Sequence, residues 1–120
     1  MILVIKGRLP TLNHVINSSK RHWAHYKKIK ESATGLCSAS AIDQLGRVQI
    51  ENPITIECEW YWPDRRTDPD NIAHGIKYVL DGLVVAGVIQ NDNWKQIHSI
   101  GHTFAIGDPQ VVVTIEEVDQ

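Results

Sequence analysis

Acidic and amide side chains concentrate in one short segment of this 120-residue sequence, Asp68-Pro69-Asp70-Asn71. Because Asp68 precedes a proline, its backbone is restricted to an extended conformation. Side chains two residues apart in an extended segment project to the same side, which places the carboxylates of Asp68 and Asp70 together. Mg²⁺ takes one or two carboxylates, several waters and often a substrate phosphate. The segment therefore predicts a magnesium site that acts on a phosphate.

Asp92 is the candidate for a third carboxylate ligand, because the chain has room to return after the intervening helical segment. A second interpretation needs no metal. Asp-Pro-Asp-Asn is also typical of a helix start, where carboxylates lie favourably near the positive end of the helix dipole. Asp92 alone is also an ordinary turn residue. The metal site and the helix start remain alternatives.

A polar stripe follows the acidic segment, with Asp70, His74, Lys77 and Asp81 spaced by four, three and four residues. This spacing places them on one face of a helix, where an ion-paired solvent face is the alternative interpretation. On an unbroken helix Asp81 lies roughly 16 Å from Asp70, too far to share a metal ion. Lys77 lies about 10 Å away, and its long stem reaches back toward a phosphate at the helix start.

Charge is distributed unevenly along the chain, whose net charge is −2. Residues 1–30 carry seven basic side chains and no carboxylate, whereas the remaining ninety residues have a balance of −9. This asymmetry indicates an anionic partner, and a nucleic-acid backbone is bound through such cations without being read for sequence. The candidate DNA-binding residues are Lys20, Arg21, Lys27, Lys28, Lys30, Arg65 and Arg66.

The elements that position these residues are indicated by hydrophobic spacing. Residues 54–62 alternate between apolar and polar side chains, which predicts a strand with one buried face. Two amphipathic segments predict helices, one over about residues 18–45 and one that begins near Asp68 and ends at Gly87. Further strands are predicted at 2–8, 95–106 and 111–118, the last two joined as a hairpin.

This pattern has the order β-α-β-α-β-β and predicts a single α/β domain over residues 1–120, with a mixed sheet packed by helices. The two cysteines are too few for a disulfide framework or a cysteine-based zinc site. No apolar run approaches the ~18 residues of a membrane span, and the first ten residues lack the features of a signal peptide. We therefore expect a cytoplasmic protein without a membrane partner.

Four motifs in order resemble the RusA family of Holliday junction resolvases, including its phage and prophage branch. They are residues 7–13 (GRLPTLN), 63–71 (PDRRTDPDN), 77–84 (KYVLDGLV) and 86–92 (AGVIQND). The resemblance implies a homodimeric, Mg²⁺-dependent endodeoxyribonuclease that resolves four-way DNA junctions by paired symmetric incisions. It implies Asp68, Asp70 and Asp92 as metal ligands and catalytic residues, and Lys77 as the catalytic lysine.

The chain departs from the family pattern at two positions. Asn91 stands where the family has the first residue of an acidic pair, and His74 stands where its lysine commonly follows the second aspartate. Lys77 fills the cationic role if three residues are inserted early in the helix; otherwise His74 is nearer. Two other functions remain open: another metal-dependent structure-specific nuclease acting on flaps or single strands, and a non-catalytic nucleic-acid-binding dimer.

Overall fold

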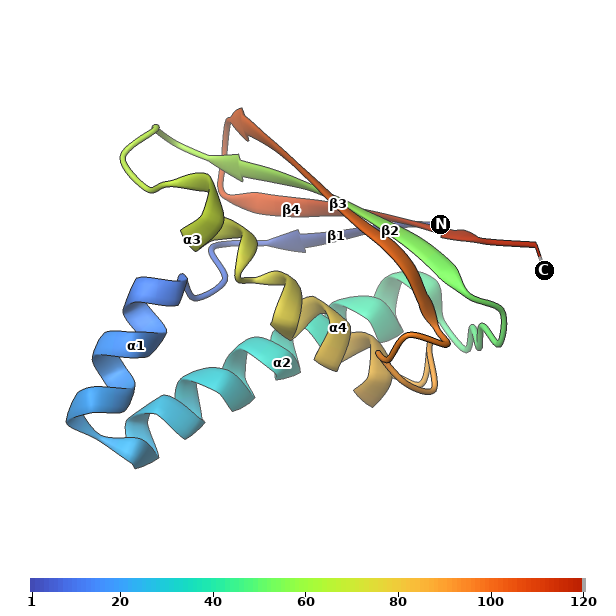
Figure 1. Cartoon of the computed structure of the whole chain (residues 1–120), viewed down its shortest axis with the longest axis horizontal. Coiled ribbons are helices and arrows are strands. Elements are labelled where there is room, and N and C mark those ends of the chain that lie inside the picture. The colour runs from blue at the N-terminus through green and yellow to red at the C-terminus, as the bar shows by residue number, and fades with distance from the viewer. Residues whose placement is uncertain (120) are drawn as a thin grey trace.

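A computed structural model describes residues 1–119, the side chain of Arg21 excepted. Figure 1 shows one sheet with the helices on one of its faces, and α1 and the first part of α2 extend beyond the sheet. In chain order the elements are β1 (Ile2–Lys6), α1 (Leu12–Arg21), α2 (Trp23–Leu45), β2 (Ile54–Trp62), α3 (Pro69–Ala73), α4 (Ile76–Val85), β3 (Ile97–Ile106) and β4 (Gln110–Glu117). This arrangement confirms the predicted α/β class, although each predicted helix is divided in two.

The sheet is mixed, and its strand order is β1-β4-β2-β3. β3 runs parallel to β2, and β4 runs antiparallel to both β1 and β2. The predicted hairpin of the last two strands is therefore wrong, because β2 lies between them. The α3–α4 crossover returns the chain parallel to β2, and residues 107–109 then pass over the end of β2, where the Gly107 N–H donates to the Trp62 carbonyl at 3.0 Å. A loop as short as residues 107–109 can therefore join β3 to β4 across the end of β2, just as it could join two neighbouring strands of a hairpin.

The core lies between the helix-facing side of the sheet and the helices α2 and α4. The predicted alternation of β2 is confirmed, because its five inward residues are all buried. They are Ile54, Ile56, Cys58, Trp60 and Trp62. Leu3 and Ile5 of β1 and Val113 of β4 are fully buried on the same side. Among the described helices, none is both long and apolar enough to cross a membrane.

The first helical region begins earlier than predicted, because Thr11 caps it. Its hydroxyl accepts a hydrogen bond from the His14 N–H at 3.3 Å, so the helix begins at Leu12 rather than near residue 18. The backbone of His22 is extended, with φ −149° and ψ 112°, and this separates α1 from α2. The two helices therefore form an arm that turns sharply at its tip (Figure 1).

The second helical region breaks at His74-Gly75, between α3 and α4. At Gly75 a Cβ atom would lie 2.7 Å from the Trp60 ring and 3.1 Å from the Cβ of Leu9, so the glycine permits close packing against the sheet. Gly82 likewise lets α4 approach the backbone of α2 at Ser38. Gly87 has φ +79° just beyond α4, which confirms it as the predicted end of this region.

Candidate functional site

The predicted metal ligands Asp68 and Asp70 lie at the junction between the loop after β2 and the start of α3, and both are exposed. Asp68 has the expected extended backbone, with φ −68° and ψ 147°, and Pro69 takes the first helical position. Within the described structure the Asp68 side chain makes no capping hydrogen bond, and Asp70 lies in the first turn. The segment therefore begins a helix, as the second interpretation predicts, but the Asp68 carboxylate does not cap that helix.

This junction is anchored from the neighbouring helix. The Asn13 N–H of α1 donates to Oδ1 of Asn71 at 3.1 Å, which fixes the residue next to Asp70. Anchoring of this kind restricts the backbone that carries the carboxylates and leaves their oxygens facing solvent. Such an arrangement offers hard oxygen ligands at a defined position, which is the donor chemistry that Mg²⁺ prefers.

A pocket of about 320 Å³ adjoins the junction at the carboxyl ends of the parallel strands β2 and β3. Trp62 of β2 and Phe104 of β3 line its apolar side, and Arg65 and Thr67 of the loop line its polar side. Ligands in open α/β sheets bind at the carboxyl ends of parallel strands. The loop is ordered locally, because the Arg66 N–H donates to Oδ1 of Asp64 at 2.9 Å.

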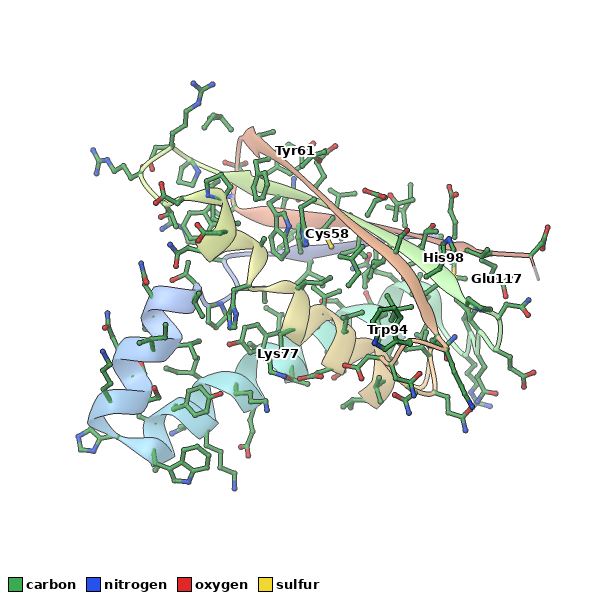
Figure 2. All side chains as sticks on the ribbon, viewed as in Figure 1. Cys58, Tyr61, Lys77, Trp94, His98 and Glu117 are labelled. Carbon is green, nitrogen blue, oxygen red and sulfur yellow. The ribbon has the colours of Figure 1, made fainter. Side chains whose placement is uncertain are left out.

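The polar stripe on α3 and α4 is not one continuous helix face. Nε2 of His74 lies 3.2 Å from the hydroxyl of Tyr78, and burial, followed by the charge of Lys77, lowers the pKa of His74. The ammonium of Lys77 lies 3.9 Å from the Asp81 carboxylate (Lys77 is labelled in Figure 2). Of the two alternatives for this helix, the break after α3 agrees with the one in which residues are inserted early, but the side chain of Lys77 points along α4 toward Asp81.

Asp92 lies in a different place from the other two predicted ligands. It lines a groove of about 790 Å³ beside α2 and α4, together with Asp81 and with Lys27 and Lys30 of α2. Across residues 1–119, no group of three histidine, cysteine or acidic side chains is placed to hold a metal ion. The structure thus places Asp68 and Asp70 at one junction, Asp68 with extended backbone and Asp70 already in the first turn of α3, and places Asp92 in a separate groove.

The groove beside α2 and α4 contains three residues that are not among the predicted site residues, namely Trp23, Tyr26 and Asp81. Asp81 is too far along the helix to share a metal ion with Asp70, but helix packing brings it to the same groove as Asp92. Trp23 is 70% exposed, and its ring centroid lies 5.6 Å from that of Tyr26, which also lines the groove. The available signal was helical spacing, because Trp23, Tyr26, Lys27 and Lys30 recur at steps that place them on one face of a helix.

The remaining predicted DNA-binding residues are spread over several surfaces. Lys28 lines a third groove of about 510 Å³ with Arg8 and His25, on another side of α2 from Lys27. Lys20 is exposed near the end of α1, and the side chain of Arg21 lies outside the described part of the chain. Arg65 and Arg66 are exposed beside the acidic junction. Cations therefore occur both on the helical arm and next to the carboxylates.

In comparisons with known proteins, no family model matches this chain and no curated protein matches it significantly. The resemblance to the RusA family therefore rests on the spaced motifs alone. The class defined by the fold is an α/β domain whose exposed carboxylate pair lies at the carboxyl ends of two parallel strands.

Proposed function

We propose that this protein is a metal-dependent endodeoxyribonuclease that resolves four-way DNA junctions as a homodimer. The observation that carries the proposal is the exposed pair Asp68 and Asp70, placed beside a pocket at the carboxyl ends of β2 and β3. The motifs that resemble the RusA family include both residues. Paired incision across a symmetric junction requires two such sites related by a two-fold axis.

The two carboxylates fit a magnesium ion by their chemistry. Both are oxygen donors with exposed side chains, and Mg²⁺ completes its coordination with waters and substrate phosphate oxygens. Bound there, Mg²⁺ supplies polarisation of a phosphoryl oxygen and activation of a water. Asp92 is the third catalytic carboxylate implied by the resemblance, and it lies in the groove beside α2 and α4, apart from the other two.

Cationic side chains of the chain bind and orient the DNA in this proposal. Arg65 and Arg66 flank the carboxylates and contact the phosphates next to the scissile one. Lys77 stabilises negative charge that develops on the phosphate, since its long stem carries a cation that can reach the phosphate. The lysines of the helical arm contact phosphates of an adjoining duplex arm and provide affinity that depends on shape and salt.

A second candidate substrate is favoured by the groove beside α2 and α4. Its wall combines the exposed ring of Trp23 and the ring of Tyr26 with the ammonium groups of Lys27 and Lys30. Aromatic platforms next to cations are typical of proteins that bind single strands. A nuclease that acts on flaps or single-stranded DNA is therefore the alternative, whereas a non-catalytic DNA-binding dimer leaves the carboxylate pair without a role.

A cleavage assay on four DNA substrates separates these functions. End-labelled duplex, single-stranded, flap and four-way DNA of the same sequence are incubated with the protein at 0 to 10 mM MgCl₂. The proposal predicts symmetric nicks in the four-way junction that require Mg²⁺. Preferred cutting of the flap or single strand would select the alternative, and binding without any cutting in Mg²⁺ or Mn²⁺ would refute nuclease activity.

A further inference from the structure

One edge of the sheet is left open. β3 is the last strand in the order β1-β4-β2-β3, and no described strand pairs with its outer side. From Ile97 to Ile106 it contains no lysine, arginine, carboxylate or proline. These are the residues with which proteins usually prevent pairing at an exposed edge. β3 therefore presents a row of main-chain donors and acceptors without the usual protection.

The opposite edge is protected. The side-chain amide of Gln44, from α2, donates to the Val4 carbonyl at 2.6 Å, and its oxygen accepts from the Val4 N–H at 2.8 Å. This pair of hydrogen bonds occupies the middle of β1 as a neighbouring strand would. Lys6 adds a charge at the end of the same strand. The fold thus blocks pairing at β1 and leaves it open at β3.

Apolar side chains are exposed at the C-terminal end of β3. Phe104 is 42% exposed and Ile106 is 53% exposed. They pair in register with Trp60 and Trp62 of β2, so they lie on the helix-facing side of the sheet. Both also line the pocket of about 320 Å³ next to Asp68 and Asp70, where α3 contributes Ile72, so the helices cover them only in part.

A groove that combines apolar side chains with the carboxylate of Asp92 lies at the opposite end of β3. Trp94, in the loop that leads into the strand, is 98% exposed and labelled in Figure 2. Together with Ile97 and Ile100 it lines a groove of about 350 Å³. The start of β3 thus carries a groove, and its end carries the apolar side chains Phe104 and Ile106.

We propose that β3 pairs antiparallel with β3 of a second copy of this chain, which joins the two sheets into one of eight strands. Antiparallel pairing brings the end of one strand to the start of the other, so Phe104 and Ile106 of each copy meet the Trp94 groove of the other. The same contact then occurs twice about a two-fold axis, as an isologous interface requires.

Charge and size both support a second copy as the partner. Because β3 has no lysine, arginine or carboxylate, it meets its own copy without the repulsion that such side chains would cause across a two-fold axis. Ile100–Ile106 is regular beyond the irregularity at the start of β3, and seven residues paired symmetrically about Thr103 give about seven main-chain hydrogen bonds. A stable interface has about ten direct hydrogen bonds. This interface is argued from the open sheet edge, and it rests on the proposed homodimer by specifying how that dimer forms. If the interface is wrong, the cleavage assay still tests the nuclease activity separately.

Sedimentation equilibrium of the full chain between 1 and 100 µM tests the interface. The edge variant Ser99→Lys/Ala105→Lys adds two charges to β3 on the side away from the helices. The control Gln110→Lys/Thr114→Lys adds the same charges to β4, which has strands on both sides. We expect a wild-type dimer, a dissociation constant raised at least tenfold in the edge variant, and a change within about twofold in the control. A wild-type monomer at 100 µM, open-ended aggregates, or equal effects of both variants would overturn the proposal.

Hydrogen exchange of the unmodified protein provides a second test that does not depend on how the variants fold. Pairing protects the outward amides of Ile100–Ile106, so we expect their exchange to slow at least tenfold between dilute and concentrated protein. The amides of β1 serve as the internal control and keep their rates. Dimerisation that leaves exchange in β3 unchanged would place the interface elsewhere.

Discussion

The ammonium nitrogen of Lys77 lies 3.9 Å from a carboxylate oxygen of Asp81, one turn further along α4. The side chains are 49% and 28% exposed. An ion pair this accessible to solvent contributes about 0–1 kcal/mol, so little free energy holds the lysine in place. Lys77 is therefore free to leave Asp81 for a substrate phosphate, whereas His74 is engaged with Tyr78.

This difference predicts a large loss of cleavage rate for one alanine variant and a small loss for another at pH 8. Lys77→Ala lowers the rate of junction cleavage about 100-fold, because a group that stabilises transition-state charge is lost. His74→Ala lowers it less than about threefold, because burial lowers the pKa of His74 and leaves the ring neutral at that pH. Single-turnover cleavage under saturating protein measures both rates. A large loss in His74→Ala with a small loss in Lys77→Ala would assign the role to the histidine.

Close packing of α4 against α2 predicts that Gly82→Ala is destabilising. The added Cβ would lie 2.5 Å from the Cβ of Cys37 and 2.9 Å from the backbone nitrogen of Ser38, so the helices must separate. We expect a loss of about 1–3 kcal/mol in the free energy of unfolding, measured by urea denaturation. Gly35→Ala is the matched control, because no described atom lies within 4 Å of its Cβ. That variant gains about 0.5–1 kcal/mol from helix propensity, and equal effects of the two substitutions would contradict this account.

The contact between Trp60 and His102 predicts lower stability in acid. The Trp60 indole N–H donates to Nδ1 of His102 at 2.9 Å, and this requires Nδ1 to be unprotonated. Burial lowers the pKa of His102 from its ordinary value of 6.5, although Glu57 acts in the opposite direction. The unfolded chain therefore binds more protons than the native one below about pH 6.5, and the free energy of unfolding falls as the pH drops.

Urea denaturation at pH 7.5, 6.0 and 5.0 measures this dependence. His102→Gln removes the titrating ring and is expected to make the decline shallower than in the wild type. His74 contributes in the same direction, since its pKa is also lowered, so some decline remains in the variant. Parallel curves for the two proteins would show that His102 is not responsible.

Much of the fold could be predicted from the sequence where one periodicity dominates. The strand at 54–62 was predicted with the observed bounds, because apolar and polar residues alternate without interruption. The hairpin was predicted wrongly, because its three-residue loop fits two topologies. Only long-range packing of the α3–α4 crossover decides that β3 lies on one side of β2 and β4 on the other.

The candidate site was predictable only in part. The local geometry of Asp68 follows from the proline after it, and the structure has the expected backbone there. The position of Asp92 depends on how α2 packs against α4, which no local spacing reveals. The break at Gly75 likewise depends on the ring of Trp60, which comes from a distant strand.

The role of the carboxylate pair is tested most directly by Asp70→Asn on a four-way junction in MgCl₂. Asparagine is tolerated near a helix start, so folding and junction binding persist while a metal ligand loses its charge. Asp43→Asn, on the exposed face of α2, is the matched control for the change in charge. We predict that Asp70→Asn lowers single-turnover cleavage at least 1,000-fold with junction affinity retained, and that the control cuts like the wild type. Cleavage by Asp70→Asn at the wild-type rate would contradict the metal site.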